Sequence, residues 1–144
     1  MEEYKYLLIP LISVIIAQVI KAIIETISTK KFSLERLFSG AGGMPSSHTV
    51  IVTSLTTLIY LNYGASSALF AISLIFSLIV MYDAMGIRYE TGKQAKVINE
   101  LAKKANLKDS FVALKEKIGH KPIEVLVGAI AGIILTCILN IAFF

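Results

Sequence analysis

Long apolar runs constrain this chain more than any other feature of its sequence. Four of them lie at about residues 6–24, 46–62, 66–83 and 122–143. The first and the last reach the ~20 residues that a helix needs to span a hydrocarbon core. With 56% hydrophobic and 17% charged residues, a water-soluble domain is disfavoured. We therefore predict an all-α integral membrane protein, one domain over 1–144, with about four transmembrane helices plus short amphipathic interfacial helices.

The two middle runs are shorter and are separated only by the uncharged segment LNYGASS. This arrangement is typical of an antiparallel helical hairpin. A cleavable signal peptide is the competing interpretation of the first run, but the start MEEYKYLL lacks a basic region and no small-residue cleavage site follows. The single cysteine, Cys137, lies inside the last run and indicates no disulfide framework.

Basic residues are concentrated in two of the segments between the runs. The segments at about 28–45 and 84–121 hold most of the Lys and Arg residues, and four spans place both on one side. The positive-inside bias predicts that this side is cytoplasmic, in a multi-pass protein of the cell membrane. A basic stripe at a bilayer surface usually contacts anionic lipid head groups, so we expect a membrane partner and no nucleic acid.

These two segments also carry weaker helix patterns. KKFSLERLF is predicted to form a short interfacial helix with Ser33 as N-cap. The third span continues its apolar spacing beyond Asp83, so the helix is expected to run on or restart, with Gly86 and Gly92 as weak points. KDSFVALKEKIGH is predicted to form another amphipathic helix that stops at Gly119.

Chemistry-bearing residues gather at GAGGMPSSHT, residues 40–49, at the border of the second span. A helix N-terminus presents free N–H groups and a positive dipole end, which favour an anion. Gly43 permits close approach of a ligand, Ser46 and Ser47 add donors, and His48 lies in the first turn. The alternative is that the serines are only helix caps and that His48 is an interfacial side chain.

A second histidine precedes the last span in GHKPIEVLVG. His120 and Glu124 are four residues apart, so their side chains can meet on a helix, and the carboxylate would orient the imidazole and raise its basicity. A carboxylate behind a histidine suits nucleophilic or general-base chemistry, although an interfacial ion pair has the same spacing. Gly128 and Gly132 form a GxxxG face, which in a membrane indicates close packing within one chain or between two.

Together these motifs resemble a known family. PSSHT is similar to the Pro-Ser-Gly-His signature of the type 2 phosphatidic acid phosphatase superfamily, and GHKPIEVLVGAIAG is similar to its final motif. The combination of GGMPSSHT, YDAMGIRYETGKQA and GHKPIEVLVG most resembles the small, divergent branch of that superfamily, over about residues 40–132. The resemblance implies a membrane phosphatase that hydrolyses a lipid phosphate or diphosphate through a phosphohistidine.

Carried over to this sequence, the family chemistry implies His120 as the nucleophile, Glu124 as its orienting acid and His48 as the general acid. Gly43, Ser46 and Ser47 would hold phosphate oxygens. No metal or other cofactor is implied, because fixed cations and N–H donors stabilise the transferring group. The substrates implied are polyprenyl diphosphates, phosphatidylglycerol phosphate or phosphatidic acid, met at the cytoplasmic leaflet.

The sequence also departs from the family pattern. The first motif, a Lys followed by Arg-Pro, is absent, and Leu114 stands where an Arg should precede the final histidine. Arg88 is the predicted replacement, Lys93 is the second choice, and Asp83 is expected to pair with Arg88 or with a neighbouring helix. With four spans instead of the usual six, dimerisation through Gly128 and Gly132 could complete the site.

These departures support an alternative function, a catalytically degenerate membrane protein that binds anionic lipid or a partner. Two further classes fit less well. YDAMGIRYETG is faintly similar to the metal-binding motif of the CDP-alcohol phosphotransferases, but only Asp83 and Glu90 lie near it as carboxylates. A transporter is disfavoured because no span carries a charge deep in its middle apart from Glu124.

Overall fold

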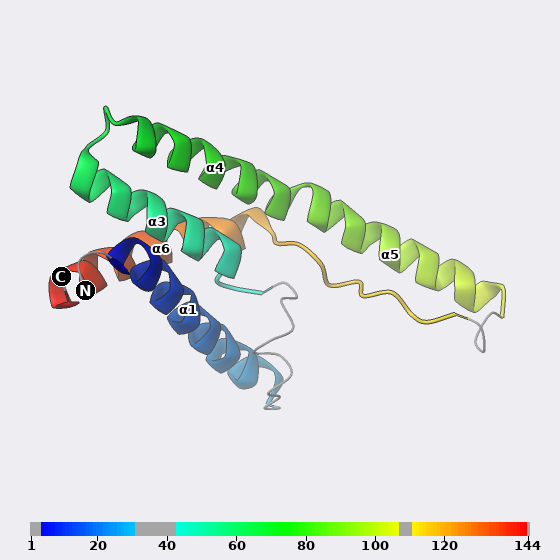
Figure 1. Ribbon diagram of the computed structural model, residues 1–144. Coiled ribbons are helices and arrows are strands. Elements are labelled where there is room, and N and C mark those ends of the chain that lie inside the picture. The colour runs from blue at the N-terminus through cyan, green and yellow to red at the C-terminus, as the bar shows by residue number, and fades with distance from the viewer. Residues whose placement is uncertain (1–3, 31–42, 107–110, 144) are drawn as a thin grey trace.

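The computed structural model describes residues 4–30, 43–106 and 111–143, and every regular element in these ranges is a helix. The predicted all-α class is confirmed. The described elements are α1 (Lys5–Thr29), α3 (Ser47–Tyr63), α4 (Ala68–Met85), α5 (Ile87–Lys104) and α6 (Pro122–Phe143) (Figure 1). A helix stands at each of the four predicted spans. The predicted short helix with Ser33 as N-cap lies outside the described residues.

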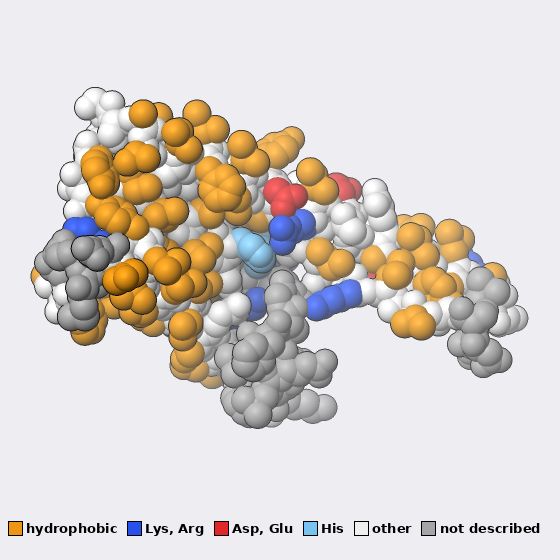
Figure 2. All heavy atoms as spheres, in the orientation of Figure 1, with side chains coloured by type: hydrophobic (Ala, Val, Ile, Leu, Met, Phe, Trp, Pro, Cys, Tyr) orange, Lys and Arg blue, Asp and Glu red, His pale blue; other side chains and the backbone are white. Residues whose placement is uncertain are grey.

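Three of the described helical segments are long and apolar enough to cross a membrane: α1, the α4–α5 rod over Ala68–Lys104, and α6. Large apolar side chains are exposed on these segments, and Leu7, Ile72 and Ile134 are among them. Figure 2 shows a largely apolar surface over the bundle on the face in view. In a membrane protein, such a surface is the part that faces lipid. With 17 residues, α3 is shorter, and its crossing of the bilayer stays a prediction.

α3 lies at the centre of the bundle and contacts α1, α4 and α6. Its buried hydroxyls bond to neighbouring helices: Thr136 Oγ1 donates to Ser54 Oγ at 2.6 Å, and the hydroxyls of Thr56 and Ser77 are 2.7 Å apart. Lipid offers polar groups no partners, so hydroxyls on a membrane helix face other helices. This requirement places the Ser- and Thr-rich α3 inside the bundle and the more apolar helices around it.

The GxxxG face of α6 packs against α3 of the same chain. A Cβ added at Gly128 would lie 2.9 Å from the carbonyl oxygen of Ser46, and one added at Gly132 would lie 2.7 Å from that of Val50. Both glycines are buried by this contact. Of the two uses predicted for Gly128 and Gly132, the structure shows the packing within one chain, and it does not show a homodimer contact through them.

Gly132→Ala is expected to destabilise the protein. The new methyl carbon would lie 2.1 Å from Thr53 Oγ1 and 2.7 Å from a backbone oxygen, so α6 must move away from α3. Overpacking of this kind costs about 1–3 kcal/mol. A lower thermal midpoint of the purified protein in detergent would show it. Ile134→Ala on the exposed face is the control, and an equal loss in both variants would contradict the packing argument.

α4 and α5 form one long rod, with Gly86 at their junction, as predicted. The predicted helix at the segment KDSFVALKEKIGH is wrong for its described part, because residues 111–121 run back along α5 without helical structure (Figure 1). The Asn99 side chain holds this segment by accepting from the Leu114 N–H and donating to the Leu114 carbonyl, both at 2.8 Å. The segment packs closely against α5 at Gly92, since a Cβ added there would lie 2.5 Å from the Glu116 carbonyl oxygen.

Candidate functional site

The two histidine motifs meet at one end of the bundle, where α3 and α6 begin and α4 ends. The chain termini and the α3–α4 turn lie at the opposite end (Figure 1). Two backbone hydrogen bonds join the elements: the Ser46 N–H donates to the Glu124 carbonyl at 3.2 Å, and the His120 N–H donates to the Ala84 carbonyl at 2.9 Å. The motifs are about 70 residues apart in sequence but form one site.

His120 and Glu124 form the buried centre of this site. Nδ1 of His120 lies 3.0 Å from Glu124 Oε2, and the His120 residue is only 4% exposed. The same carboxylate oxygen accepts from the Lys121 N–H at 3.1 Å. Pro122 begins α6, so Glu124 lies in its first turn and its side chain reaches back to the residues just before the helix. The spacing predicted from the sequence brings this pair together.

The environment of His120 favours a neutral ring. Burial lowers the pKa of the imidazole below its ordinary value of 6.5, and this effect exceeds the opposite effects of Glu124 and of a backbone hydrogen bond with Gly43. A neutral histidine whose Nδ1–H bonds a carboxylate has its lone pair on Nε2. This lone pair is available once the ring gives up its hydrogen bond with Gly43. The pair can therefore supply a nucleophile at neutral pH.

The N-terminus of α3 lies beside this pair. Ser46 is the N-cap residue; its hydroxyl accepts from the Thr49 N–H and hydroxyl and is fully buried. For Ser46, the structure thus shows the capping role. Within the described part of the chain, the buried Ser47 hydroxyl has no hydrogen-bond partner. Of the two predicted serines, Ser47 is therefore the one whose hydroxyl is not used by the helix cap.

His48 is exposed at the rim of the site, where Figure 2 shows a histidine between the apolar surface and a group of charged side chains. Its Nε2 lies 3.5 Å from Arg88 Nη1, and Arg88 also pairs with Asp83, as predicted. The two histidines are close enough for a charge on His120 to act on His48. The structure therefore brings the predicted arginine to the site.

Lys21 of α1 is a site residue that the sequence analysis did not identify. It is only 5% exposed, and its charge acts on His48, His120 and Glu124. A Cβ added at Gly43, where φ is +110°, would lie 3.1 Å from Lys21 Cε. The Gly43 backbone thus runs between Lys21 and His120. In the sequence, Lys21 is indistinguishable from a lysine that extends toward the interface from a helix end.

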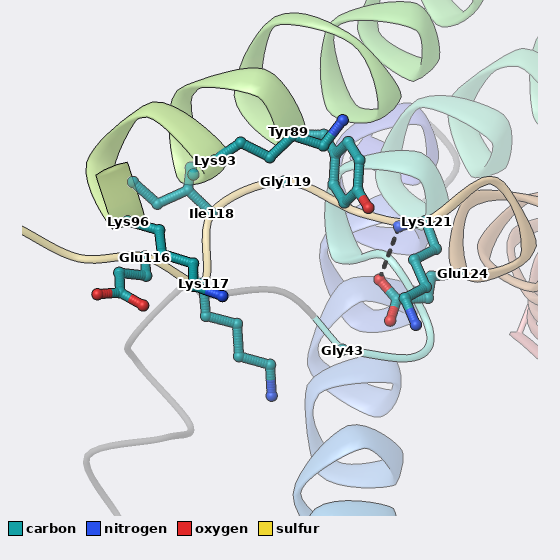
Figure 3. Close-up of a pocket in the computed structure, with 11 residues that line it drawn as sticks. Gly43, Tyr89, Lys93, Lys96, Glu116, Lys117, Ile118, Gly119, Lys121 and Glu124 are labelled. Carbon is teal, nitrogen blue, oxygen red and sulfur yellow. Dashed lines mark hydrogen bonds between the residues drawn. The ribbon is translucent and has the colours of Figure 1, made fainter. Parts of the chain in front are cut away.

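Lys93 contributes to a neighbouring pocket. Its Nζ lies 2.7 Å from Glu90 Oε1 and 4.7 Å from the Tyr89 ring centre. The pocket has a volume of about 330 Å³, lies between α5 and the segment before α6, and includes Gly43 and Glu124 in its lining (Figure 3). Figure 3 shows the Lys93 side chain extended along α5 toward Tyr89. Lys93 is thus near the site but is engaged with Glu90.

The described residues at the site provide cations and hydrogen-bond donors. Lys21 and Arg88 carry fixed positive charges, and the free N–H groups at the start of α3 add the positive end of a helix dipole. Within residues 4–30, 43–106 and 111–143, no three His, Cys, Asp or Glu side chains group as metal ligands. This arrangement is suited to bind an anion such as phosphate beside the two histidines.

Comparisons with known proteins bear on the family of the chain. The family model described as the divergent PAP2 family matches residues 3–135. The chain is 44% identical over 146 residues to a protein of Bacillus subtilis (strain 168) described as the uncharacterized membrane protein YuiD, and the match covers 92% of each chain. No solved structure matches.

Proposed function

We propose that this chain, which belongs to the divergent PAP2 family, is a membrane lipid phosphatase. It would hydrolyse the phosphate monoester or diphosphate of a lipid, such as a polyprenyl diphosphate, phosphatidylglycerol phosphate or phosphatidic acid. The buried His120–Glu124 pair beside the N-terminus of α3 is the observation that carries this proposal. The alternatives from the sequence were an interfacial ion pair of His120 with Glu124 and a simple helix cap at Ser46. Neither requires a buried lysine at the site, and Lys21 is such a lysine.

The proposed reaction has two steps. Nε2 of His120 attacks the phosphorus while Nδ1–H stays bonded to Glu124, and the bond from phosphorus to the leaving oxygen breaks. His48 gives its proton to that oxygen, which leaves as the lipid alcohol or lipid monophosphate. Water then attacks the phosphorus of the phosphohistidine while His48 takes up a proton of the water. The bond from phosphorus to Nε2 breaks, and inorganic phosphate leaves. The bound phosphate would replace the hydrogen bond that the ring now makes with Gly43.

The transferring group needs donors for three oxygens. In this proposal they are the Ser47 hydroxyl, the N–H groups at the start of α3 and the Lys21 ammonium group. Arg88 contacts His48, so it lies on the side of the leaving oxygen. Arg88 and Lys21 together would take over the role of the family arginine and lysine that the sequence lacks.

The function is tested by phosphate release from purified protein in detergent, with a chelator present, on a panel of lipid phosphates. His48→Ala is expected to lower the rate on lipid phosphates by about 10²–10⁴-fold, the usual contribution of a general acid. Its effect on kcat/KM for p-nitrophenyl phosphate should be much smaller, because kcat/KM reports the first step, in which nitrophenolate leaves without a proton. Equal losses of kcat/KM on both substrates would contradict the assignment of His48 as the acid.

The pH dependence should follow the lowered pKa of His120. A neutral nucleophile is required, so kcat/KM should fall on an acidic limb below pH 6.5, as the His120 ring becomes protonated. A second limb is expected at higher pH, where His48 loses the proton that it must give to the leaving oxygen. The Glu124 charge raises this pKa, so Glu124→Gln should move the acidic limb to still lower pH while lowering the rate. Glu90→Gln, which removes a carboxylate bonded to Lys93, should leave the limb in place. A limb that moves to higher pH in Glu124→Gln would refute the pairing.

The site would face the cytoplasm in this proposal. α5 extends from the site and ends in Lys103 and Lys104, and the positive-inside bias places such segments on the cytoplasmic side. Binding without turnover is the alternative function. Vanadate or phosphate that competes with lipid, together with no hydrolysis of any lipid phosphate on the panel, would favour that alternative.

A further inference from the structure

An apolar groove begins at His48 and runs along the membrane part of the bundle. It has a volume of about 370 Å³ and lies between α1, α3 and α4. Its lining includes Leu11, His48, Ile51, Leu55, Phe76 and Val80. From His48 to Leu55, α3 rises about 10 Å, so the groove leads from the charged rim well into the apolar part of the bundle. Leu11 and Phe76 are exposed, so the groove is open to lipid.

The proposed reaction fixes which side of the site the lipid occupies. An in-line displacement places the leaving oxygen opposite the attacking nitrogen of His120. The general acid must contact that leaving oxygen, so the leaving group lies on the side of His48. Everything in the substrate except the transferred phosphoryl group belongs to the leaving group. Its hydrocarbon chain must therefore begin beside His48, where the groove begins.

A second apolar groove is larger but lies on the other side. It has a volume of about 710 Å³ and lies between α4 and α6, with Pro122 and Val125 in its lining. These residues belong to the first turn of α6, which carries Glu124 behind the nucleophile. A chain in this groove would place the leaving group on the side of His120, which in-line attack does not allow. Volume alone therefore does not identify the chain site.

From this geometry we infer that the groove between α1, α3 and α4 holds a single hydrocarbon chain of the leaving alcohol. This inference rests on the proposed phosphatase function. Lipid chains are as apolar as the leucines of the groove, so exchanging one bilayer lipid for another gains little affinity. The groove acts instead by orienting the phosphate between the histidines, and a displacement of about 1 Å at such a site can cost 10²-fold in rate.

Photocrosslinking tests the groove independently of turnover. The probe is a long-chain alkyl phosphate with a photoreactive group in its chain, bound to the His120→Asn variant in detergent. We expect labelling of α3 and α4 around Leu55 and Phe76, with competition by the unlabelled long-chain alkyl phosphate but not by the alcohol of the same chain. Labelling concentrated at Leu126 in the other groove, or labelling unaffected by the phosphate, would overturn the inference.

Activity provides a second test with matched variants. Leu55→Phe and Val80→Phe narrow this groove, while Ile79→Phe and Leu126→Phe add the same bulk to the other one. The first pair should lose about tenfold or more in kcat/KM on a long-chain alkyl phosphate and change little on p-nitrophenyl phosphate. A loss confined to the second pair would overturn the inference. Absence of any phosphate release by the wild-type protein would instead refute the proposed function, which the crosslinking pattern does not test.

Discussion

His120→Asn is expected to reduce phosphate release from lipid phosphates by at least about 10³–10⁴-fold, because the variant lacks the nucleophile. Asparagine keeps a polar group of limited size at this buried position, where the backbone N–H already bonds to Ala84. The measurement is initial-rate phosphate release in detergent with a chelator present. The thermal midpoint of the variant, compared with that of the wild type, shows whether the fold is retained.

The loss alone does not prove a covalent intermediate, so the phosphorylated residue must be identified. In His48→Ala, p-nitrophenyl phosphate should still phosphorylate the protein, while the loss of the base slows hydrolysis of the phosphohistidine. A labelled phosphoryl group should then accumulate on His120, stable to base and labile to acid, and be absent from the double variant with His120→Asn. Phosphorus on any other residue would refute the role of His120, and full activity of His120→Asn would refute the mechanism.

The helices were predictable because each apolar run is bounded by clear signals, such as Ser46 before α3 and Pro122 at the start of α6. The segment at 111–121 was not predictable in the same way. The apolar residues of this segment have helical spacing. The Asn99 side chain, however, bonds to the Leu114 backbone and holds the segment along α5 without helical structure. A contact between residues 15 apart in sequence overrides the local pattern.

The site was predictable where its residues are close in sequence. The i,i+4 spacing of His120 and Glu124 indicated their pairing, and Asp83 and Arg88 are also near neighbours in the sequence. The use of Gly128 was ambiguous, because a GxxxG face serves equally within one chain and between two. The three-dimensional structure distinguishes the two uses, because it places Gly128 of α6 against the Ser46 backbone of the same chain.

Lys21 could not have been assigned from the sequence. It precedes the glycine-rich segment by some 20 residues, and only the packing of α1 against α3 brings it beside Gly43. A buried lysine on a membrane helix is costly unless nearby groups stabilise it, and such residues usually have a function. Its charge acts on Glu124 and on both histidines, so it lies where a phosphate would need a cation.

Lys21→Met is therefore expected to lower kcat/KM on lipid phosphates by about 10²–10³-fold, the usual loss when one preorganised donor to a transition state is removed. Methionine keeps much of the apolar length of the side chain, so the contact with Gly43 should survive and the thermal midpoint should not fall. Because the lysine would bind the phosphate itself, the inhibition constant of vanadate should rise in parallel.

Lys117→Met is the matched control for this variant. Lys117 lies on the segment before α6, is largely exposed and pairs with Glu25 at 3.9 Å, so its removal changes the net charge equally without removing a buried cation. It should alter kcat/KM by less than about threefold, as exposed ion pairs contribute little. If both variants lose the same activity, the effect of Lys21 is one of overall charge. If Lys21→Met retains full activity and vanadate affinity, Arg88 and the α3 N-terminus hold the phosphate without it.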